Sequence, residues 1–327
     1  MRKSIDLSSR IPGALFGHAI GDALGVPVEF MTRSQLDQDA VTDFRAFGTH
    51  NQPPGTWSDD TSLMLCTVDA LCEGPGIERI ANKFIRWLRH AEWTAHGDVF
   101  DVGNSTYEAI ARLEAGERPD LAGGIEESSN GNGSLMRILP MGFALREEGS
   151  EFKRTESFVI SALTHGHPRS KFACWFFVEI IVEICRLKSI EESVDIAHGR
   201  ISNWVDEHHG QESEWHHYRS CKSTIKQRDR QTIQSSGYVV HSMEASLWCL
   251  LNSSNYSDAV LKAVNLGDDS DTTGAITGGL AGALYGFEGI PEDWTKNLAR
   301  ANEIRELADL YSRKLLEAGP QRKQAHT

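Results

Sequence analysis

The sequence predicts an all-α protein, and three observations lead to this fold class. Apolar residues recur at spacings of three and four, most clearly at Ile77, Ile80, Phe84 and Trp87, which is the period of an amphipathic helix. Alternating β-branched runs and hairpin signals, which would indicate strands, are weak throughout. The composition is typical of a globular protein with a sizeable core, since 40% of the 327 residues are hydrophobic and 24% are charged. We therefore expect residues 1–327 to form a single domain, a compact multi-helix bundle.

The first expected helix covers residues 11–30 and carries unusually small side chains. It contains Gly13, Gly17, Gly21 and Gly25, and Pro12 suits its first turn. A glycine costs roughly 1 kcal/mol at an interior helix position, so this many of them predict close packing of the backbone against another element. Asp22 and Glu29 would then lie in or beside a crowded interior. The alternative is an exposed turn that carries two surface carboxylates.

The remaining helices are expected where apolar periodicity resumes between polar segments. Ser58 is the expected N-cap of the second one. The expected ranges are 58–71, 77–88, 105–115, 156–163, 171–187, 190–207, 237–251, 257–265, 274–286 and 302–318. Residues 36–56 are polar, contain Pro53-Pro54-Gly55 and predict a loop. Residues 208–236 are rich in His, Gln, Ser, Lys and Arg, which predicts a polar, mobile segment with few apolar anchors. Its histidines and Cys221 do not follow a standard zinc-site spacing.

Charge and cysteine usage narrow the classes of function. The chain has 33 lysines and arginines against 46 aspartates and glutamates, a net charge of −13, which disfavours binding to nucleic acid. The six cysteines are scattered without a CxxC pair, which indicates reduced thiols and a cytoplasmic location. The longest apolar candidate, Phe172–Ile184, contains Glu179 and Glu183, so we expect no membrane span.

Two acidic clusters are candidates for a functional site, because each directly precedes an apolar run. One is Gly267-Asp268-Asp269-Ser270-Asp271-Thr272-Thr273-Gly274, and the other is Thr56-Trp57-Ser58-Asp59-Asp60-Thr61. Their carboxylates and hydroxyls are hard oxygen ligands, which suit Mg²⁺ or Mn²⁺ better than zinc. Together with Glu29 the clusters supply five candidate ligand carboxylates, whose charge two divalent cations would nearly neutralise. If the clusters converge, a binuclear site that positions and activates water is the expected result.

Three loops are further candidates for a binding site. Residues 128–134, Ser-Ser-Asn-Gly-Asn-Gly-Ser, precede an expected helix start at Leu135 and can present backbone N–H groups to an anion, although Asn-Gly pairs also form ordinary turns. Thr164-His165-Gly166-His167-Pro168 is either a ligand contact or a capped turn. Residues 99–104 form a short loop before a helix.

Five of these segments, taken in order, carry a resemblance to a known family. They are 21–25 with Glu29, Ser58-Asp59-Asp60-Thr61, 131–137, 164–168 and 267–272. The chain resembles the ADP-ribosylglycohydrolase family, and most of all its dinitrogenase-reductase-activating branch, over residues 11–287. The resemblance implies an all-α fold with two Mg²⁺ or Mn²⁺ ions in a cleft. It also implies hydrolysis of the bond that joins ADP-ribose to a protein side chain.

The resemblance assigns roles to individual residues. The implied metal ligands are Ser58, Asp59, Asp60, Asp269, Asp271 and Thr272, where Ser58 replaces the threonine of many relatives. The implied catalytic groups are Glu29, Asp60 and Asp101. Glu29 would act as a metal ligand or as the base that takes a proton from the attacking water, and Asp60, as a metal-bound carboxylate, could take this proton instead. Asp101 would hold and protonate the leaving guanidinium. The implied substrate contacts are Asp22, Gly103, Asn104, Asn130, Gly131, Asn132, Gly133, Ser134 and His165.

We therefore expect a metal-dependent hydrolase that acts on ADP-ribosylated protein and releases ADP-ribose. Arginine is the preferred acceptor, because Asp101-Val102-Gly103-Asn104 resembles the loop of the arginine-acting branch. Its role would be to reverse a regulatory modification or to act as an immunity protein against an ADP-ribosylating toxin. The alternatives are a non-catalytic relative that binds ADP-ribose, and a metal-dependent phosphohydrolase that acts on nucleotides.

Overall fold

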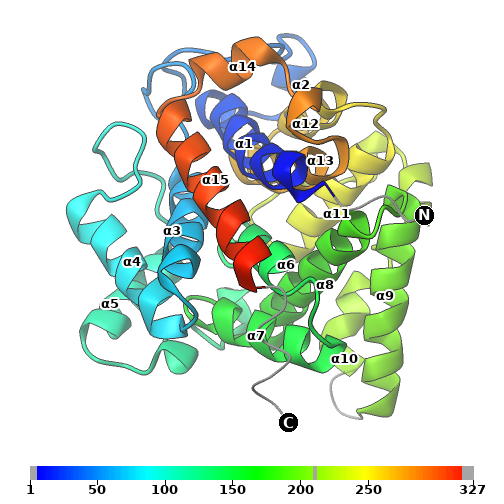
Figure 1. Cartoon of the computed structure of the whole chain (residues 1–327). Helices are drawn as coiled ribbons and strands as arrows, with labels where there is room; N and C mark the ends of the chain where they lie inside the picture. Colours follow the sequence, from blue (N-terminus) through cyan, green and yellow to red (C-terminus); the bar gives the residue numbers. More distant parts are fainter. Residues whose placement is uncertain (1–5, 209–211, 319–327) are drawn as a thin grey trace.

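Helices alone make up the regular structure of residues 6–208 and 212–318, which the computed structural model describes (Figure 1). The α-helices are α1 (Leu7–Gly25), α2 (Arg33–Leu36), α3 (Asp59–Glu73), α4 (Ile77–His90), α5 (Asn104–Glu114), α6 (Leu139–Ala144), α7 (Ser150–Ala162), α8 (Pro168–Cys185), α9 (Ile190–Glu207), α10 (Glu212–Trp215), α11 (Val239–Leu251), α12 (Tyr256–Val264), α13 (Ser270–Tyr285), α14 (Glu292–Asn297) and α15 (Ala301–Ala318). Short 3₁₀ turns lie at Val26–Val28, Pro119–Leu121, Glu127–Ser129, His216–Tyr218, Ser223–Gln227, Arg230–Thr232 and Phe287–Gly289. The predicted all-α class is confirmed.

Two glycine-rich helices, α1 and α13, lie side by side at the centre of the fold (Figure 1). A Cβ atom built on Gly17 would lie 2.4 Å from the carbonyl oxygen of Gly278, and one on Gly21 would lie 2.0 Å from that of Gly274. Real Cβ atoms do not approach backbone atoms this closely, so only glycine permits this packing. The close packing expected for the N-terminal helix is therefore confirmed, and α13 is its partner.

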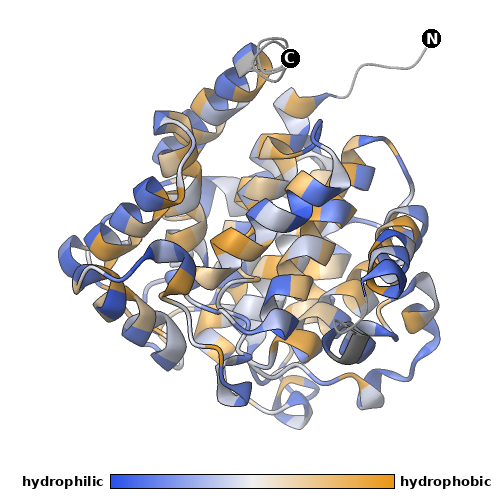
Figure 2. Cartoon of the chain, turned by 90° about the horizontal axis from the view of Figure 1, so that it is seen from below, coloured by the Kyte–Doolittle hydropathy of each residue, from blue (hydrophilic) through white to orange (hydrophobic). Residues whose placement is uncertain are grey.

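The surrounding helices bury their apolar faces against this pair. Among the largest fully buried side chains are Trp57, Trp87 and Trp175. Figure 2 shows hydrophilic and hydrophobic residues mixed along the outlying helices, as expected for elements with one face toward solvent. The apolar stretch Leu7–Val28 is long enough to cross a membrane, but its most apolar window is completely buried inside the fold. It replaces Phe172–Ile184 as the longest apolar candidate.

The expected helices are present, but some begin at other residues, and short helices occur that were not expected. Helix α7, for example, begins at Ser150 rather than at residue 156. The helix expected at Leu135 is a turn, and α6 begins only at Leu139, next to Pro140 in its first turn. The first helix starts at Leu7, so Pro12 lies in its interior rather than in its first turn. The short α14 was not expected, because six residues are too few for a helical period to be recognised.

Residues 212–236 differ from the expectation of a segment with few apolar anchors. Trp215, Tyr218, Cys221, Ile225 and Ile233 are all buried in the core. The spacing of these residues follows short turns rather than one helical face, which is why the sequence pattern concealed them. Residues 209–211 lie outside the described residues.

Candidate active site

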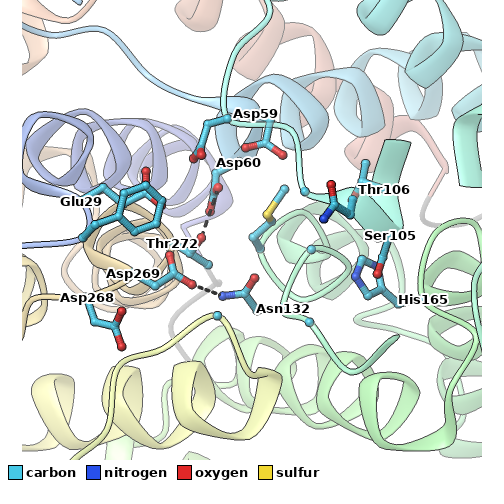
Figure 3. A pocket seen from close by; sticks show the side chains of 18 residues that line it. Glu29, Asp59, Asp60, Ser105, Thr106, Asn132, His165, Asp268, Asp269 and Thr272 are labelled. Carbon is cyan, nitrogen blue, oxygen red and sulfur yellow. Dashed lines mark hydrogen bonds between the residues drawn. The ribbon is translucent and has the colours of Figure 1, made fainter. Parts of the chain in front are cut away.

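The candidate site is a cavity of about 300 Å³ that lies where both acidic clusters meet (Figure 3). Its carboxylates are Glu29, Asp59, Asp60, Asp101, Asp268 and Asp269. Its other wall consists of residues 103–106, 131–133 and the side chain of His165. The structure therefore brings together at least six segments that are far apart in the sequence.

Helix α1 fixes the first acidic cluster through Asp22. Both carboxylate oxygens of Asp22 accept hydrogen bonds from the Ser58 N–H, at 2.9 and 3.1 Å, and one of them also accepts from the Thr61 N–H at 3.0 Å and the Thr61 hydroxyl at 2.6 Å. These donors belong to the start of α3, where N–H groups have no partner within the helix. Asp22 thus lies beneath the cavity and positions Asp59 and Asp60. Burial raises its pKa to about 6.

The end of the same helix fixes the second cluster. A Cβ atom on Gly25 would lie 2.3 Å from the Cα of Asp271, so the last turn of α1 packs directly on the first turn of α13. The Ser270 hydroxyl donates to the Gly25 carbonyl at 3.0 Å. The Thr272 hydroxyl in turn donates to Asp60 at 3.3 Å and connects the two clusters. The convergence that the sequence suggested follows from one helix that contacts both.

The buried carboxylates lack the partners that their charges require. Both carboxylate oxygens of Asp271, and one of Asp60, are buried without a hydrogen-bond donor among the described residues. Asp271 approaches the carboxyl groups of Asp101 and Asp269, and two carboxyl groups share a hydrogen bond only when one is protonated. Burial, together with the neighbouring carboxylates, raises the pKa values of Asp60 and Asp271 well above their usual range.

This donor set fits divalent cations. The ligand oxygens of Glu29, Asp269 and Asp271 lie within 4.8 Å of one another and all three residues are buried. Oxygen-only groups of this kind suit Mg²⁺ or Mn²⁺. Asp59, Asp60 and Thr272 lie close by, whereas Ser58 caps α3, with its hydroxyl 3.3 Å from both the N–H and the carboxylate of Asp60. Ser58 is therefore at the edge of the group.

A second group contains the histidine His50, which the sequence motifs did not reveal. Its Nε2 atom is hydrogen-bonded to the carboxylate of Glu29 and lies 3.8 Å from the carboxylate of Asp101. Its ring packs against the rings of Phe30 and Phe100. Burial and the charge of Asp269 raise the pKa of Glu29 to about 8, and burial and the charge of Glu29 raise that of Asp101 to about 7. The cavity therefore holds two carboxyl groups whose protons are exchangeable near neutral pH. One histidine in a polar loop gives no sequence signal for such a role.

The loop 130–134 forms the opposite wall through only part of its length. The Asn132 side chain donates to Asp269 at 2.6 Å and to Ser242 at 2.8 Å, and its backbone N–H donates to Gly237, so this amide group is not available to an anion. Gly131, Asn132 and Gly133 face the cavity. Ser134 is fully buried, and its hydroxyl lies 3.0 Å from the hydroxyl of Ser161 and 3.4 Å from Sγ of Cys174.

His165 contributes a neutral imidazole with a defined tautomer. The buried Arg137 donates to the Thr164 hydroxyl at 2.8 Å, and this hydroxyl lies 2.8 Å from Nδ1 of His165. A hydroxyl that accepts from arginine satisfies its own proton by donating to Nδ1, which leaves the proton of the ring on Nε2. Burial and the charge of Arg137 lower the pKa of His165 to about 3. The ring therefore offers a neutral N–H donor beside Gly131 and Gly133.

The predicted residues separate into two groups. Those that line the cavity are Glu29, Asp59, Asp60, Asp101, Gly103, Asn104, Gly131, Asn132, Gly133, His165, Asp269 and Thr272. Asp22, Ser58, Asn130, Ser134 and Asp271 lie behind its wall, and Asn130 is held by Glu127 and Ser170. The cavity also contains Ser105, Thr106 and Asp268, none of which was predicted to contact substrate.

Comparison with known proteins shows the family to which the chain is similar. A sequence profile described as ADP-ribosylglycohydrolase matches residues 3–324. A protein named ADP-ribosylarginine hydrolase Tri1, from Pseudomonas putida (strain GB-1), is 35% identical over 314 residues, which cover 93% of this chain and 78% of that protein. A second protein of the same name, from Serratia proteamaculans (strain 568), is 33% identical over 300 residues. This match covers 91% of this chain and 77% of that protein.

Two further similarities extend over nearly the whole chain. The ADP-ribosyl-[dinitrogen reductase] glycohydrolase of Rhodospirillum rubrum is 28% identical over 315 residues, covering 92% of this chain and 94% of that protein. A solved structure described as an ADP-ribosylglycohydrolase-related protein complex superimposes with a TM-score of 0.73 at 27% identity. It covers 95% of this chain and 99% of the other.

Proposed function

The chain belongs to the ADP-ribosylglycohydrolase family, and on this premise we propose that it hydrolyses the bond between ADP-ribose and a modified arginine side chain, with two Mg²⁺ or Mn²⁺ ions as cofactors. The observation that carries the proposal is the convergence of unpaired buried carboxylates on a cavity whose opposite wall offers neutral hydrogen-bond donors. The arginine-specific names of two relatives support the choice of acceptor.

The proposed cofactors are held by the acidic clusters. Asp59, Asp60, Asp269, Asp271 and Thr272 would be the ligands, with Ser58 at the edge of the group and Glu29 beside it. When bound, the ions would polarise a water molecule and neutralise the negative charge that gathers here. The unpaired oxygens of Asp271 and Asp60 support this assignment, because an isolated buried carboxylate is costly without a cation.

The residues of the chain then divide the chemical work. Glu29 is placed to take a proton from the water that attacks the anomeric carbon of the ribose, and His50 holds its carboxylate in place. The bond from this carbon to the guanidinium nitrogen breaks, and Asp101 supplies the proton that the leaving nitrogen takes up. The Nε2–H of His165 donates to a diphosphate oxygen, so binding at a distance from the reacting carbon fixes the geometry.

Release of intact ADP-ribose is the decisive test. The protein is incubated with proteins ADP-ribosylated on arginine, serine or cysteine, in Mg²⁺, in Mn²⁺ and in EDTA. We expect release from the arginine substrate, dependent on the metal, and its loss in Asp60→Asn. Inorganic phosphate in place of ADP-ribose would instead support the nucleotide phosphohydrolase. Tight binding of ADP-ribose without turnover of any substrate would support the non-catalytic relative.

The cellular role forms part of the same proposal. Six cysteines without a disulfide partner support a reducing, cytoplasmic location. There the enzyme would reverse a regulatory modification or protect the cell from an ADP-ribosylating toxin. A toxin gene beside the coding sequence would decide for the second role.

A further inference from the structure

The orientation of the proposed substrate in the cavity follows from the positions of the lining residues. An ADP-ribosylated side chain presents the diphosphate, the ribose and the acceptor in that order. Figure 3 shows His165, Ser105 and Thr106 on one side of the acidic clusters and Glu29 and Asp268 on the other. If the proposed function holds, the diphosphate lies toward His165 and the acceptor leaves the ribose toward Glu29 and Asp268.

A second cavity begins on that side of the site, and we call it the side cavity. Its volume is about 540 Å³, and its walls come from residues 30–33, Gln231, residues 233–236, His241, Leu266 and Asp268. This volume is within the usual range of ligand cavities, about 300–1,000 Å³. Phe30 and Asp268 line both cavities, so the side cavity continues the candidate site.

The junction between the two cavities has an unusual and firmly held backbone. Phe30 and Asp268 both adopt left-handed conformations, with φ of 63° and 62°, which are rare for residues other than glycine. The Phe30 N–H donates to the Asp268 carbonyl at 2.7 Å, and the Asp268 N–H donates to the Met31 carbonyl at 2.8 Å. Phe30 is 64% exposed in spite of its apolar ring. Backbone conformations of this kind cluster at active sites and at sites that hold a ligand.

The walls of the side cavity suit a polypeptide rather than an anion. Arg33 donates its guanidinium hydrogens to the carbonyl oxygens of Leu266 and Ile233, so its donors serve the fold. Gln231 and Gln234 are exposed and carry both donors and acceptors, which match a peptide backbone. The exposed carboxylate of Asp268 adds a negative charge that attracts a basic flanking residue.

We propose that the side cavity binds the polypeptide of the modified protein next to its ADP-ribosylated side chain, and so selects the acceptor protein. This proposal rests on the proposed function. It separates recognition of ADP-ribose, on the His165 side, from recognition of the protein, on the Phe30 side. A substrate that lacks a polypeptide therefore makes no use of the side cavity.

The test compares two substrates in two variants. The substrates are a short basic peptide that carries one ADP-ribosyl-arginine, and ADP-ribosyl-agmatine, which has the guanidinium without a peptide. Gln234→Trp places a bulky ring in the side cavity. Gln38→Trp is the matched control, because Gln38 is exposed and lines neither cavity. We expect Gln234→Trp to lower kcat/KM for the peptide about tenfold or more, through KM, and to leave the agmatine substrate unchanged. Gln38→Trp should leave both unchanged.

Three outcomes would overturn the proposal. Equal turnover of the peptide by wild type and Gln234→Trp would show that the side cavity is not used. An equal loss for both substrates, with an unchanged melting temperature, would place the effect of Gln234→Trp in the ADP-ribose site. Absence of turnover of either substrate by the wild type, in Mg²⁺ and in Mn²⁺, would reject the proposed function itself. That last result is distinct from the first two, in which the wild type is active.

Discussion

Replacement of Asp271 by asparagine offers a test of the metal site that does not depend on turnover. Asp271 is completely buried and no donor of the described residues reaches its oxygens. Asparagine has nearly the same shape but carries no charge. In EDTA we therefore expect Asp271→Asn to be more stable than the wild type, and we expect Mg²⁺ to stabilise the variant much less than it stabilises the wild type.

The size of the effect follows from the cost of the proton. An unfolded aspartate titrates near pH 3.9, and each pH unit above this value adds about 1.36 kcal/mol to the cost of keeping it protonated. At pH 7 this cost to the metal-free wild type is therefore at most about 4 kcal/mol. The variant has no carboxyl group at this position and avoids the cost. In the wild type, Mg²⁺ at a hundred times its Kd adds about 2.7 kcal/mol to the free energy of unfolding. The variant loses most of this gain.

Chemical unfolding in EDTA and in Mg²⁺ measures both effects, with Glu179→Gln as the control. Glu179 is also fully buried but is paired with Lys153, at 2.8 Å, and with Arg200. Its replacement should destabilise the protein equally under both conditions, because it leaves the buried ammonium of Lys153 without its carboxylate partner. If Asp271→Asn behaved like Glu179→Gln, the buried carboxylates would not form a cation site.

Two further predictions concern His165 in the wall of the cavity and the response of the protein to pH. Thr164→Val removes the hydroxyl that fixes the tautomer of His165. The affinity for ADP-ribose in Mg²⁺, measured by calorimetry, should therefore fall about fivefold to tenfold. The control is Thr67→Val, which loses only a hydrogen bond to a helix carbonyl and should leave this affinity unchanged. Glu29 and Asp101 have pKa values raised to about 8 and about 7, so the stability that their protonated forms confer is complete below about pH 4 and is lost as pH rises to about 8. The gain in free energy of unfolding from Mg²⁺ should therefore increase between pH 4 and 8, and a constant gain would contradict these shifts.

Several features of the site were predictable because they depend on short stretches of sequence. The start of α3 at Ser58-Asp59-Asp60 was predicted from the capping preference of serine followed by an apolar run. The acidic cluster with Asp269 and Asp271 was also recognisable locally, because a glycine-rich helix follows it directly in the sequence. The order of five short motifs was sufficient to indicate the family.

Other features depend on contacts between distant segments. Asp22 was predicted to bind substrate, but the structure places it under α3, because a carboxylate on α1 meets the free N–H groups of Ser58 and Thr61 there. His50 lies in a loop without a motif and reaches the site only because its ring packs against Phe100. No local pattern contains these contacts.

Residue type and spacing alone indicated the candidate site residues, namely the two acidic clusters, the glycine-rich helix of residues 11–30 and the loop with Asn132. These are properties of residue type and spacing, which the chain retains before it folds. Which of these residues lie close together depends on the folded chain. The close packing of α1 and α13, which requires glycine at Gly17 and Gly278, places Asp271 beside Gly25 and Glu29 at the same cavity. Convergence depends on the distances between backbone segments in the folded protein, and neither periodicity nor composition specifies these distances.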